Sequence, residues 1–210
     1  MRGLLIVFEG VEGSGKSTQA EMLFQALKRE GRPCVLSREP GGTPIGEAIR
    51  DILLDNRFQE MHARTELLLY LASRNQHVHE KLLPAIRQGL IAISDRFTDS
   101  SLAYQGKGRD LSFQVVSRLN KFATAGLIPD MVIIVDVPPE LGRQRMKGTA
   151  PDRLEAEKEH FHEQVRAAYL QLARRAPKRV RVFDGHQTPA ALHEQIRRSA
   201  QELLRRRGWL

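Results

Sequence analysis

The chain has 210 residues, of which 41% are hydrophobic and 28% are charged, a composition typical of globular proteins. No apolar run approaches the ~18 residues that a membrane span requires. The single cysteine, Cys34, excludes an internal disulfide and suits a reducing cytoplasm. We therefore expect a cytoplasmic protein without membrane contact, forming one domain over residues 1–210.

The net charge of +8 is concentrated near the C-terminus. Residues 174–210 carry ten basic and three acidic side chains, whereas residues 1–173 carry 23 basic and 22 acidic ones. Such a segment is either a surface for nucleic acid or a solvated helix face. We favour the solvated face, so nucleic acid is not an expected partner.

Short apolar runs alternate with segments of helical spacing along the chain. Strands are expected at residues 4–8, 34–37, 90–94, 131–137 and 179–183. Helices are expected at 16–30, 45–54, 65–88 (bent near Pro84), 112–125, 140–147, 154–174 and 189–207, with a polar loop at 148–153. Because the strands are apolar throughout and separated by helices, the pattern predicts an α/β fold. Its core would be a doubly wound five-stranded parallel sheet with helices on both faces.

The most specific motif is GVEGSGKS at residues 10–17, which matches G-x-x-x-x-G-K-[ST]. It lies between an expected strand and an expected helix, as a phosphate loop (P-loop) requires. Lys16 can reach the β and γ phosphates of ATP, and the Ser17 hydroxyl can hold Mg²⁺. The residues expected to contact the nucleotide are Gly10, Val11, Glu12, Gly13, Ser14, Gly15, Lys16, Ser17 and Thr18. The motif alone does not decide between a kinase, a switch and a motor.

Asp95 directly follows the expected strand 90–94, at the end where open parallel sheets bind ligands. A carboxylate there can hold Mg²⁺ through a water, although a helix N-cap is an alternative. Arg96 comes next, and burying an arginine without an anion is costly. We therefore expect Ser17 and Asp95 to form the metal site and Arg96 to bind a phosphate.

Five ordered runs resemble the bacterial thymidylate kinase family: SREPGGTPIGEAIR at 37–50, YLASR at 70–74, SDRFTDSSLAYQGKGR at 94–109, PDMVIIVDVPPE at 129–140 and DRLE at 152–155. With the P-loop they extend from about Ile6 to Phe161. The resemblance implies a P-loop NTPase fold with a short mobile lid at about 147–154. It implies transfer of the γ-phosphoryl group of ATP to the 5′-phosphate of dTMP, with Mg²⁺, by a homodimer.

The resemblance also implies residues around the acceptor phosphate and sugar. Glu12 would lie near the sugar and the metal. Glu39 and Arg50 would line the acceptor phosphate site, and Arg96 would grip that phosphate. Phe97 stands where the family often has tyrosine or histidine, so a hydroxyl contact is lost at that position.

Four more residues are implied on the side of the base. Tyr70 would stack on thymine, while Arg74, Ser101 and Gln105 would read the base edge. Tyr70 and Arg74 are four residues apart on an expected helix and so share a face, as Ser101 and Gln105 would on a helix of their own. The structural alternatives are a core aromatic for Tyr70, a surface ion pair with Glu66 or Glu80 for Arg74, and an ordinary polar face for the other two.

The P-loop of this sequence contains no arginine, a version that in the family accompanies cations supplied by the lid. We expect the loop 148–153 to stay out of the core and to bring that charge. Arg153 is the first catalytic candidate and Lys147 the second, with Arg143 and Arg145 near the nucleotide. The alternative for Arg153 is a local ion pair with Asp152, Glu155 or Glu157.

The predicted chemistry needs no general base, because the acceptor phosphate is already mostly a dianion at neutral pH. Lys16, Arg96, a lid cation and Mg²⁺ would offset the repulsion between the two polyanions. Two alternatives remain: a kinase for another nucleoside monophosphate, and a P-loop ATPase that acts on nucleic acid through the basic C-terminal segment.

Overall fold

A computed structural model describes residues 2–148 and 150–209. Its centre is a parallel sheet of five strands in the order β2-β3-β1-β4-β5. The strands are β1 (Leu4–Glu9), β2 (Cys34–Arg38), β3 (Ile91–Asp95), β4 (Met131–Asp136) and β5 (Val180–Asp184). Each lies within two residues of its predicted bounds, and the doubly wound parallel sheet is confirmed.

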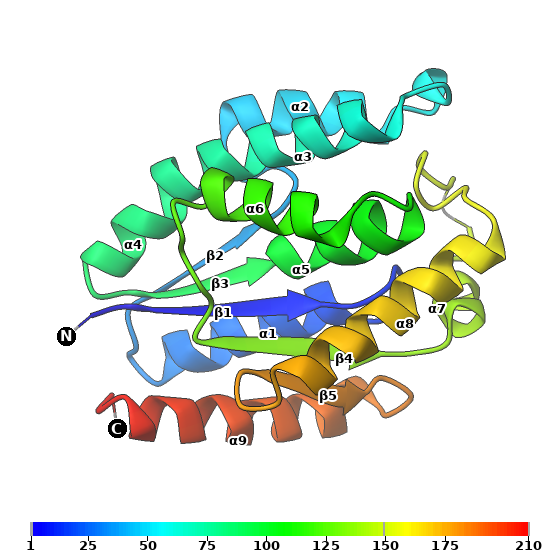
Figure 1. Ribbon diagram of the computed structural model, residues 1–210. Coiled ribbons are helices and arrows are strands. Elements are labelled where there is room, and N and C mark those ends of the chain that lie inside the picture. Colours follow the sequence, from blue (N-terminus) through cyan, green and yellow to red (C-terminus); the bar gives the residue numbers. More distant parts are fainter. Residues whose placement is uncertain (1, 149, 210) are drawn as a thin grey trace.

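Helices cover both faces of the sheet (Figure 1). The α-helices are α1 (Lys16–Arg29), α2 (Pro44–Leu54), α3 (Ala63–His77), α4 (Leu83–Arg87), α5 (Thr98–Ser101), α6 (Phe113–Ala123), α7 (Pro139–Arg145), α8 (Glu159–Arg175) and α9 (Pro189–Arg206). A 3₁₀ turn, η1 (Asn56–Phe58), and two π-helical segments, η2 (Val78–Leu82) and η3 (Leu102–Gly108), complete the elements. No helix in the described part of the chain is long and apolar enough to cross a membrane.

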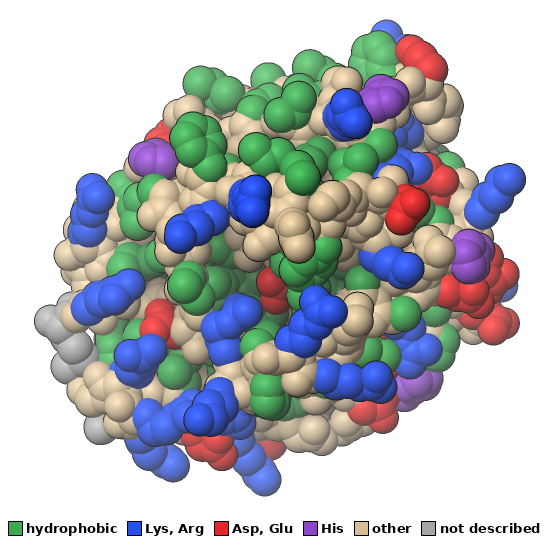
Figure 2. All heavy atoms as spheres, in the orientation of Figure 1, with side chains coloured by type: hydrophobic (Ala, Val, Ile, Leu, Met, Phe, Trp, Pro, Cys, Tyr) green, Lys and Arg blue, Asp and Glu red, His purple; other side chains and the backbone are tan. Residues whose placement is uncertain are grey.

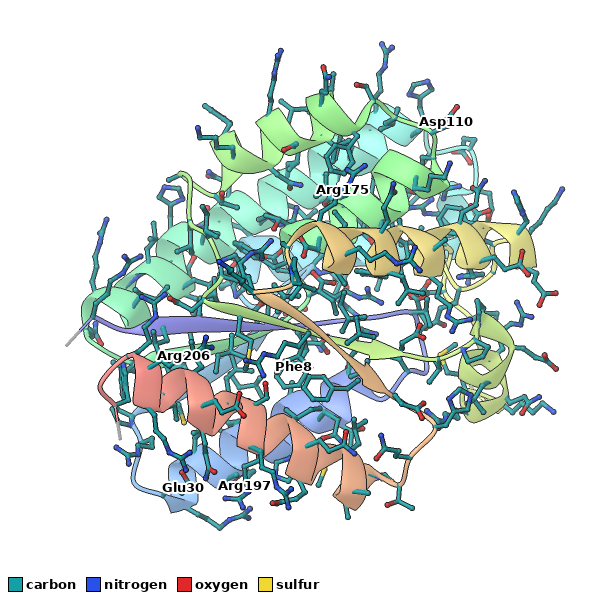
Figure 3. The ribbon with its side chains drawn as sticks, turned by 60° about the horizontal axis from the view of Figure 1, so that its bottom comes forward. Phe8, Glu30, Asp110, Arg175, Arg197 and Arg206 are labelled. Carbon is teal, nitrogen blue, oxygen red and sulfur yellow. The ribbon has the colours of Figure 1, made fainter. Side chains whose placement is uncertain are left out.

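The alternating residues of each strand enter two separate hydrophobic layers. In β1, Leu5 and Val7 pack with residues of η2, α4 and α8. Leu4, Ile6 and Phe8 of the same strand pack with α1 and α9 on the other face. Figure 3 shows Phe8 between the sheet and these two helices. Because both faces are covered, β1 is apolar at every position from Leu4 to Phe8, which is why the strand could be recognised.

The long helix predicted at 65–88 is a continuous run from α3 through η2 to α4. The wider π-helical turn of η2 lies directly before Pro84, whose ring cannot fit inside an undistorted α-helix. The helix predicted to start at Leu154 instead starts at Glu159. Asp152 Oδ1 accepts from the amides of Leu154 and Glu155, both at 2.9 Å, so these residues form a turn rather than a helix.

Candidate active site

The P-loop connects the end of β1 to α1. Gly10, Gly13 and Gly15 adopt positive φ angles of 142°, 68° and 93°. A Cβ on Gly13 would lie 2.1 Å from the carbonyl oxygen of Gly142 in α7, so a side chain there would displace the loop. Lys16 is only 8% exposed and its Nζ donates to Val11 O at 3.4 Å. The loop therefore folds back over the lysine at the N-terminus of α1.

Two cavities open on either side of this loop. The first, here the Arg96 cavity, has a volume of about 390 Å³. It is lined by Glu12, Gly13, Lys16, Ser17, Arg38, Glu39, Pro40, Arg50, Leu54, Tyr70, Asp95, Arg96, Ser100, Tyr104, Gln105, Met146, Asp152, Leu154 and Glu155.

The second, here the Arg145 cavity, has a volume of about 430 Å³. It is lined by Gly13, Ser14, Gly15, Lys16, Ser17, Thr18, Gln19, Arg145, Met146, Gly185, Gln187, Pro189 and Leu192. Gly13, Lys16, Ser17 and Met146 line both cavities. Two ligands, one in each cavity, would therefore meet at Lys16.

Two oxygen groups meet at the same junction. The Ser17 hydroxyl donates to Asp95 Oδ2, while Asp95 Oδ1 is buried without a hydrogen-bond partner among the described residues. Hydroxyl and carboxylate oxygens are ligands that suit Mg²⁺, which usually takes one or two protein groups and completes its shell with phosphate and water. In the described part of the chain no three His, Cys, Asp or Glu side chains gather as a metal cage. The residues thus fit a magnesium ion that arrives with a nucleotide.

Arg96 is held in a strained position at the wall of its cavity. Its φ of 73° is unusual for a residue with a side chain. Its guanidinium donates to Glu12 at 2.8 Å, to Tyr104 at 3.2 Å and to Tyr169 at 3.1 Å. Burial opposes its charge, but the surrounding oxygens of these residues hold the pKa of Arg96 well above its ordinary value. Arg96 is therefore a fixed cation facing the cavity.

Glu9 organises the turn behind Arg96, and sequence reasoning missed it. This fully buried carboxylate accepts from the amides of Phe97 at 2.9 Å and Ser100 at 3.2 Å, and from the Tyr169 hydroxyl at 2.9 Å. Burial, with Asp99 nearby, raises the pKa of Glu9 to about 7. A charged residue ending the apolar run LLIVF was the available signal. No local feature points to Tyr169, which comes from the distant helix α8.

Arg50 supplies a cation that makes no ion pair with an acidic side chain among the described residues. It lines the Arg96 cavity and donates to Pro40 O at 3.0 Å. Burial and the neighbouring Arg38 lower the pKa of Arg50, so this charge is poorly compensated in the unliganded protein. Arg38, which the sequence analysis did not single out, lines the same cavity beside Glu39. Such a site favours an anion.

Tyr70 and Gln105 line the Arg96 cavity, as the family resemblance predicts, but Arg74 and Ser101 do not. Arg74 is 1% exposed, and its guanidinium donates to Glu39 at 2.6 Å, Ser101 at 2.7 Å and Phe97 O at 2.8 Å. Arg74 Nη1 also donates to Asn120 Oδ1 at 2.5 Å. The ion pair considered with Glu66 or Glu80 is wrong: the partner is Glu39 from the loop after β2.

The region predicted as a lid is partly docked on the core. Arg153 is 2% exposed, its guanidinium lies 2.7 Å from Glu66, and its Nε donates to Leu53 O at 2.9 Å. The expectation that residues 148–153 stay out of the core is therefore wrong for Arg153, and its ion pair is not local. Leu154 belongs to the hydrophobic layer above the sheet.

The other lid-region cations differ in position. Lys147 is exposed, and Arg143 is ion-paired with Glu159 at 2.7 Å. Arg145 lines the second cavity and donates to Gly185 O at 2.8 Å, with weaker contacts of 3.5 and 3.4 Å to the P-loop carbonyls of Gly13 and Ser14. Of these three side chains, Arg145 is the one that contacts the predicted nucleotide-binding residues.

Other cavity residues escaped notice although their sequence runs were recognised. Tyr104 lies one residue before Gln105, and its hydroxyl donates to Glu12 at 2.7 Å. The Arg96 guanidinium also lies over the Tyr104 ring, 5.0 Å from the ring centroid. Asp152 and Glu155 belong to the DRLE run and line the same cavity.

The parallel sheet, the P-loop at the end of β1 and the two cavities meeting at Lys16 define a P-loop protein that binds a nucleoside triphosphate beside a second ligand. The thymidylate kinase family model matches residues 8–196. Curated relatives include thymidylate kinases from Pelotomaculum thermopropionicum, 46% identical over 97% of this chain and 95% of that protein, and Caldanaerobacter subterraneus, 45% identical over 98% of each. A crystal structure of thymidylate kinase from Ehrlichia chaffeensis superposes with a TM-score of 0.78 at 30% identity, over 96% of this chain and 99% of that one. The chain belongs to the thymidylate kinase family.

Proposed function

We propose that this protein transfers the γ-phosphoryl group of ATP to the 5′-phosphate of dTMP, giving dTDP and ADP. The observation that carries the proposal is the meeting of two cavities at Lys16 and Ser17. ATP would occupy the Arg145 cavity with its γ-phosphate over the P-loop, and dTMP the Arg96 cavity. Family membership and the full-length similarity to curated thymidylate kinases support this choice of substrates. They support neither another monophosphate kinase nor a nucleic-acid ATPase.

The residues of the Arg96 cavity suit a monophosphate whose base lies away from the P-loop. Lys16, Arg50 and Arg96 can surround its phosphate, and the Tyr70 ring can stack on a flat base. The acceptor dianion needs no proton removed. The Glu12 carboxylate accepts hydrogen bonds from Arg96 and Tyr104. Burial opposes its charge, but Arg96 and Lys16 keep the pKa of Glu12 below the ordinary value. It would orient groups rather than take a proton.

Catalysis would then be a matter of position and charge. Lys16 and Arg96 would stabilise the negative charge that spreads over the moving phosphoryl group. Ser17 and Asp95 would hold Mg²⁺, which when bound neutralises charge on the β and γ phosphates. For the cation that the lid would bring to the transferred phosphoryl group, we propose Lys147 or Arg145 rather than Arg153, because Arg153 forms an ion pair with Glu66.

A homodimer formed through α2, α3 and α6 is the second part of the proposal. Large hydrophobic side chains are exposed on this side, among them Leu68 at 59% and Phe122 at 83%. Figure 2 shows hydrophobic side chains spread over the upper face, where these helices lie in Figure 1. An exposed apolar area of this kind marks an interaction surface.

We also propose a cytoplasmic protein that does not bind nucleic acid. The single Cys34 is a free thiol, as a reducing compartment allows. In the basic C-terminal segment, Arg197 lies 3.5 Å from Glu30, which directly follows α1, and Arg207 lies 2.7 Å from Asp130 (Figure 3 labels Arg197 and Glu30). Arginines paired in this way support the solvated helix face.

The test is a phosphoryl-transfer assay with ATP and Mg²⁺ across a panel of nucleoside monophosphates. dTMP should have the highest kcat/KM. If AMP, CMP or GMP is used as well as dTMP or better, the proposed function is refuted. Hydrolysis of ATP that does not depend on an acceptor would instead support the ATPase alternative.

A further inference from the structure

Three side chains on one face of α3 form a stripe beside the Arg96 cavity. Glu66, Tyr70 and Arg74 are spaced by four residues, which places them on the same side of the helix. Tyr70 lines the cavity. Glu66 and Arg74, one turn to either side, are fully buried and contact polar residues of the segment α5–η3. The proposed base platform is therefore flanked by two fixed charges.

Glu66 is the end of this stripe that sequence reasoning left without a function. It is 0% exposed and lies 3.0 Å from Arg109 and 2.7 Å from Arg153. Burial opposes its charge, but hydrogen bonds from Arg109 and Gln105, together with the nearby guanidinium of Arg153, lower the pKa of Glu66 below its ordinary value. Glu66 is thus an ionised carboxylate, and an ionised carboxylate can only accept hydrogen bonds.

Gln105 connects this carboxylate to the cavity. The side chain lines the Arg96 cavity, and its Nε2 donates to Glu66 Oε1 at 2.9 Å. Because Glu66 can only accept, the amide must present its NH₂ group to Glu66. No group in residues 2–148 or 150–209 donates to Gln105 Oε1. The carbonyl oxygen is therefore the acceptor that this amide has left for a ligand in the cavity.

We propose that Glu66 is a specificity-determining positioning residue, which fixes the Gln105 amide so that its carbonyl oxygen, and not its NH₂ group, faces the base of the acceptor. The proposal rests on the proposed function, because it needs a pyrimidine monophosphate in the Arg96 cavity. Glu66 itself does not line that cavity and acts through Gln105.

The chemistry of pyrimidines explains what this orientation selects. Thymine and uracil carry a hydrogen at N3 and donate there, whereas neutral cytosine has a lone pair at N3 and accepts. A fixed carbonyl oxygen accepts from the N3–H of thymine or uracil. Against cytosine it places two acceptors face to face, which leaves a buried polar group unpaired. A carboxylate that prevents the amide from turning therefore lowers the preference of the cavity for cytosine relative to thymine and uracil.

The test is Glu66→Gln in the full-length protein, assayed with dTMP, dUMP and dCMP as acceptors. The new amide can donate as well as accept, so the Gln105 amide becomes free to turn. We expect the ratio of kcat/KM for dCMP to that for dTMP to rise about tenfold or more. The ratio of dUMP to dTMP should stay unchanged, because both bases donate at N3.

Two further variants separate positioning from structure. Glu157→Gln removes the other acidic partner of Arg109 and leaves the Gln105–Glu66 bond in place, so both acceptor ratios should remain those of the unchanged protein. If Glu66→Gln does not fold, Gln105→Met keeps the ion pairs of Glu66 with Arg109 and Arg153. It should reduce discrimination between dTMP and dCMP by a similar factor.

The outcomes are distinct. A parallel loss for all three acceptors in Glu66→Gln, with unchanged ratios, would mean that Glu66 is only structural and would overturn the proposal. So would Gln105→Met with full discrimination. A protein that does not phosphorylate dTMP at all would refute the proposed function instead.

Discussion

Because Arg153 forms a buried ion pair with Glu66, we expect its loss to lower the free energy of unfolding. In Arg153→Ala, Glu66 loses a guanidinium at 2.7 Å and Leu53 O loses the hydrogen bond from Nε. Removing one partner of a buried pair costs 3–5 kcal/mol, and because Arg109 still neutralises Glu66 we take the lower end, about 3 kcal/mol. In a chain of this length, 1 kcal/mol shifts the melting temperature by about 2–4 °C, so the midpoint should fall by about 6–12 °C.

The assay is thermal or urea unfolding of the protein without nucleotide, with kcat measured on the same preparations. Lys147→Ala is the matched control, because Lys147 is exposed in the same region and should shift the midpoint by only about 1–2 °C. A normal midpoint in Arg153→Ala, combined with a strong loss of kcat, would refute this reasoning. Arg153 would then leave Glu66 during turnover and act as the lid cation.

The remaining predictions concern the P-loop, the turn behind Arg96 and the apolar face. Lys16→Ala should lower kcat by about a hundredfold or more, which corresponds to ~3 kcal/mol. The melting temperature should change little, because burial and Arg96 lower the pKa of Lys16, so its charge adds no stability to the protein without ligands. A near-normal kcat would contradict this prediction. Because the pKa of Glu9 is about 7 in the folded protein and 4.5 otherwise, the folded chain binds more protons between these values. Its free energy of unfolding should therefore fall by about 3 kcal/mol as pH rises through this window, and urea titrations of Glu9→Gln should lack that decrease. Phe122→Glu should convert the proposed dimer to a monomer in analytical ultracentrifugation, and a monomeric unmodified protein would contradict the proposed interface.

The parts of the fold that could be predicted are those set by neighbours in sequence. The apolar runs predict the strands because both faces of the sheet are covered. The P-loop could be recognised because its glycines, Lys16 and Ser17 are neighbours in sequence, within residues 10–17. The segment α5–η3 is not among the predicted helices, because α5 has only four residues and the π-helical η3 does not have the residue spacing of an α-helix. Even so, Ser101 and Gln105 do face the same helix, α3, as their spacing predicts.

The contacts that could not be predicted join residues far apart in sequence. Local reasoning offered Asp152, Glu155 and Glu157 as partners of Arg153, but the structure pairs it with Glu66 on α3. An arginine in a recognised run can bind a substrate or a buried carboxylate, and the run is the same in both cases. Which of the two holds depends on where a distant acidic residue comes to lie.

This dependence divides the basic residues of the site into two kinds. Arg74 and Arg153 are buried against Glu39 and Glu66, so their charges are satisfied before any ligand binds, and their substitution should cost stability first. Lys16 and Arg50 line the Arg96 cavity, and neither has an ion pair with any acidic residue in the described part of the chain. Burial and a neighbouring arginine lower the pKa of both side chains more than the nearby carboxylates raise it, so an incoming anion would stabilise both charges. A fold that keeps such cations without ion pairs in its substrate cavities gives up stability there, and the phosphates of its two substrates would restore that stability on binding.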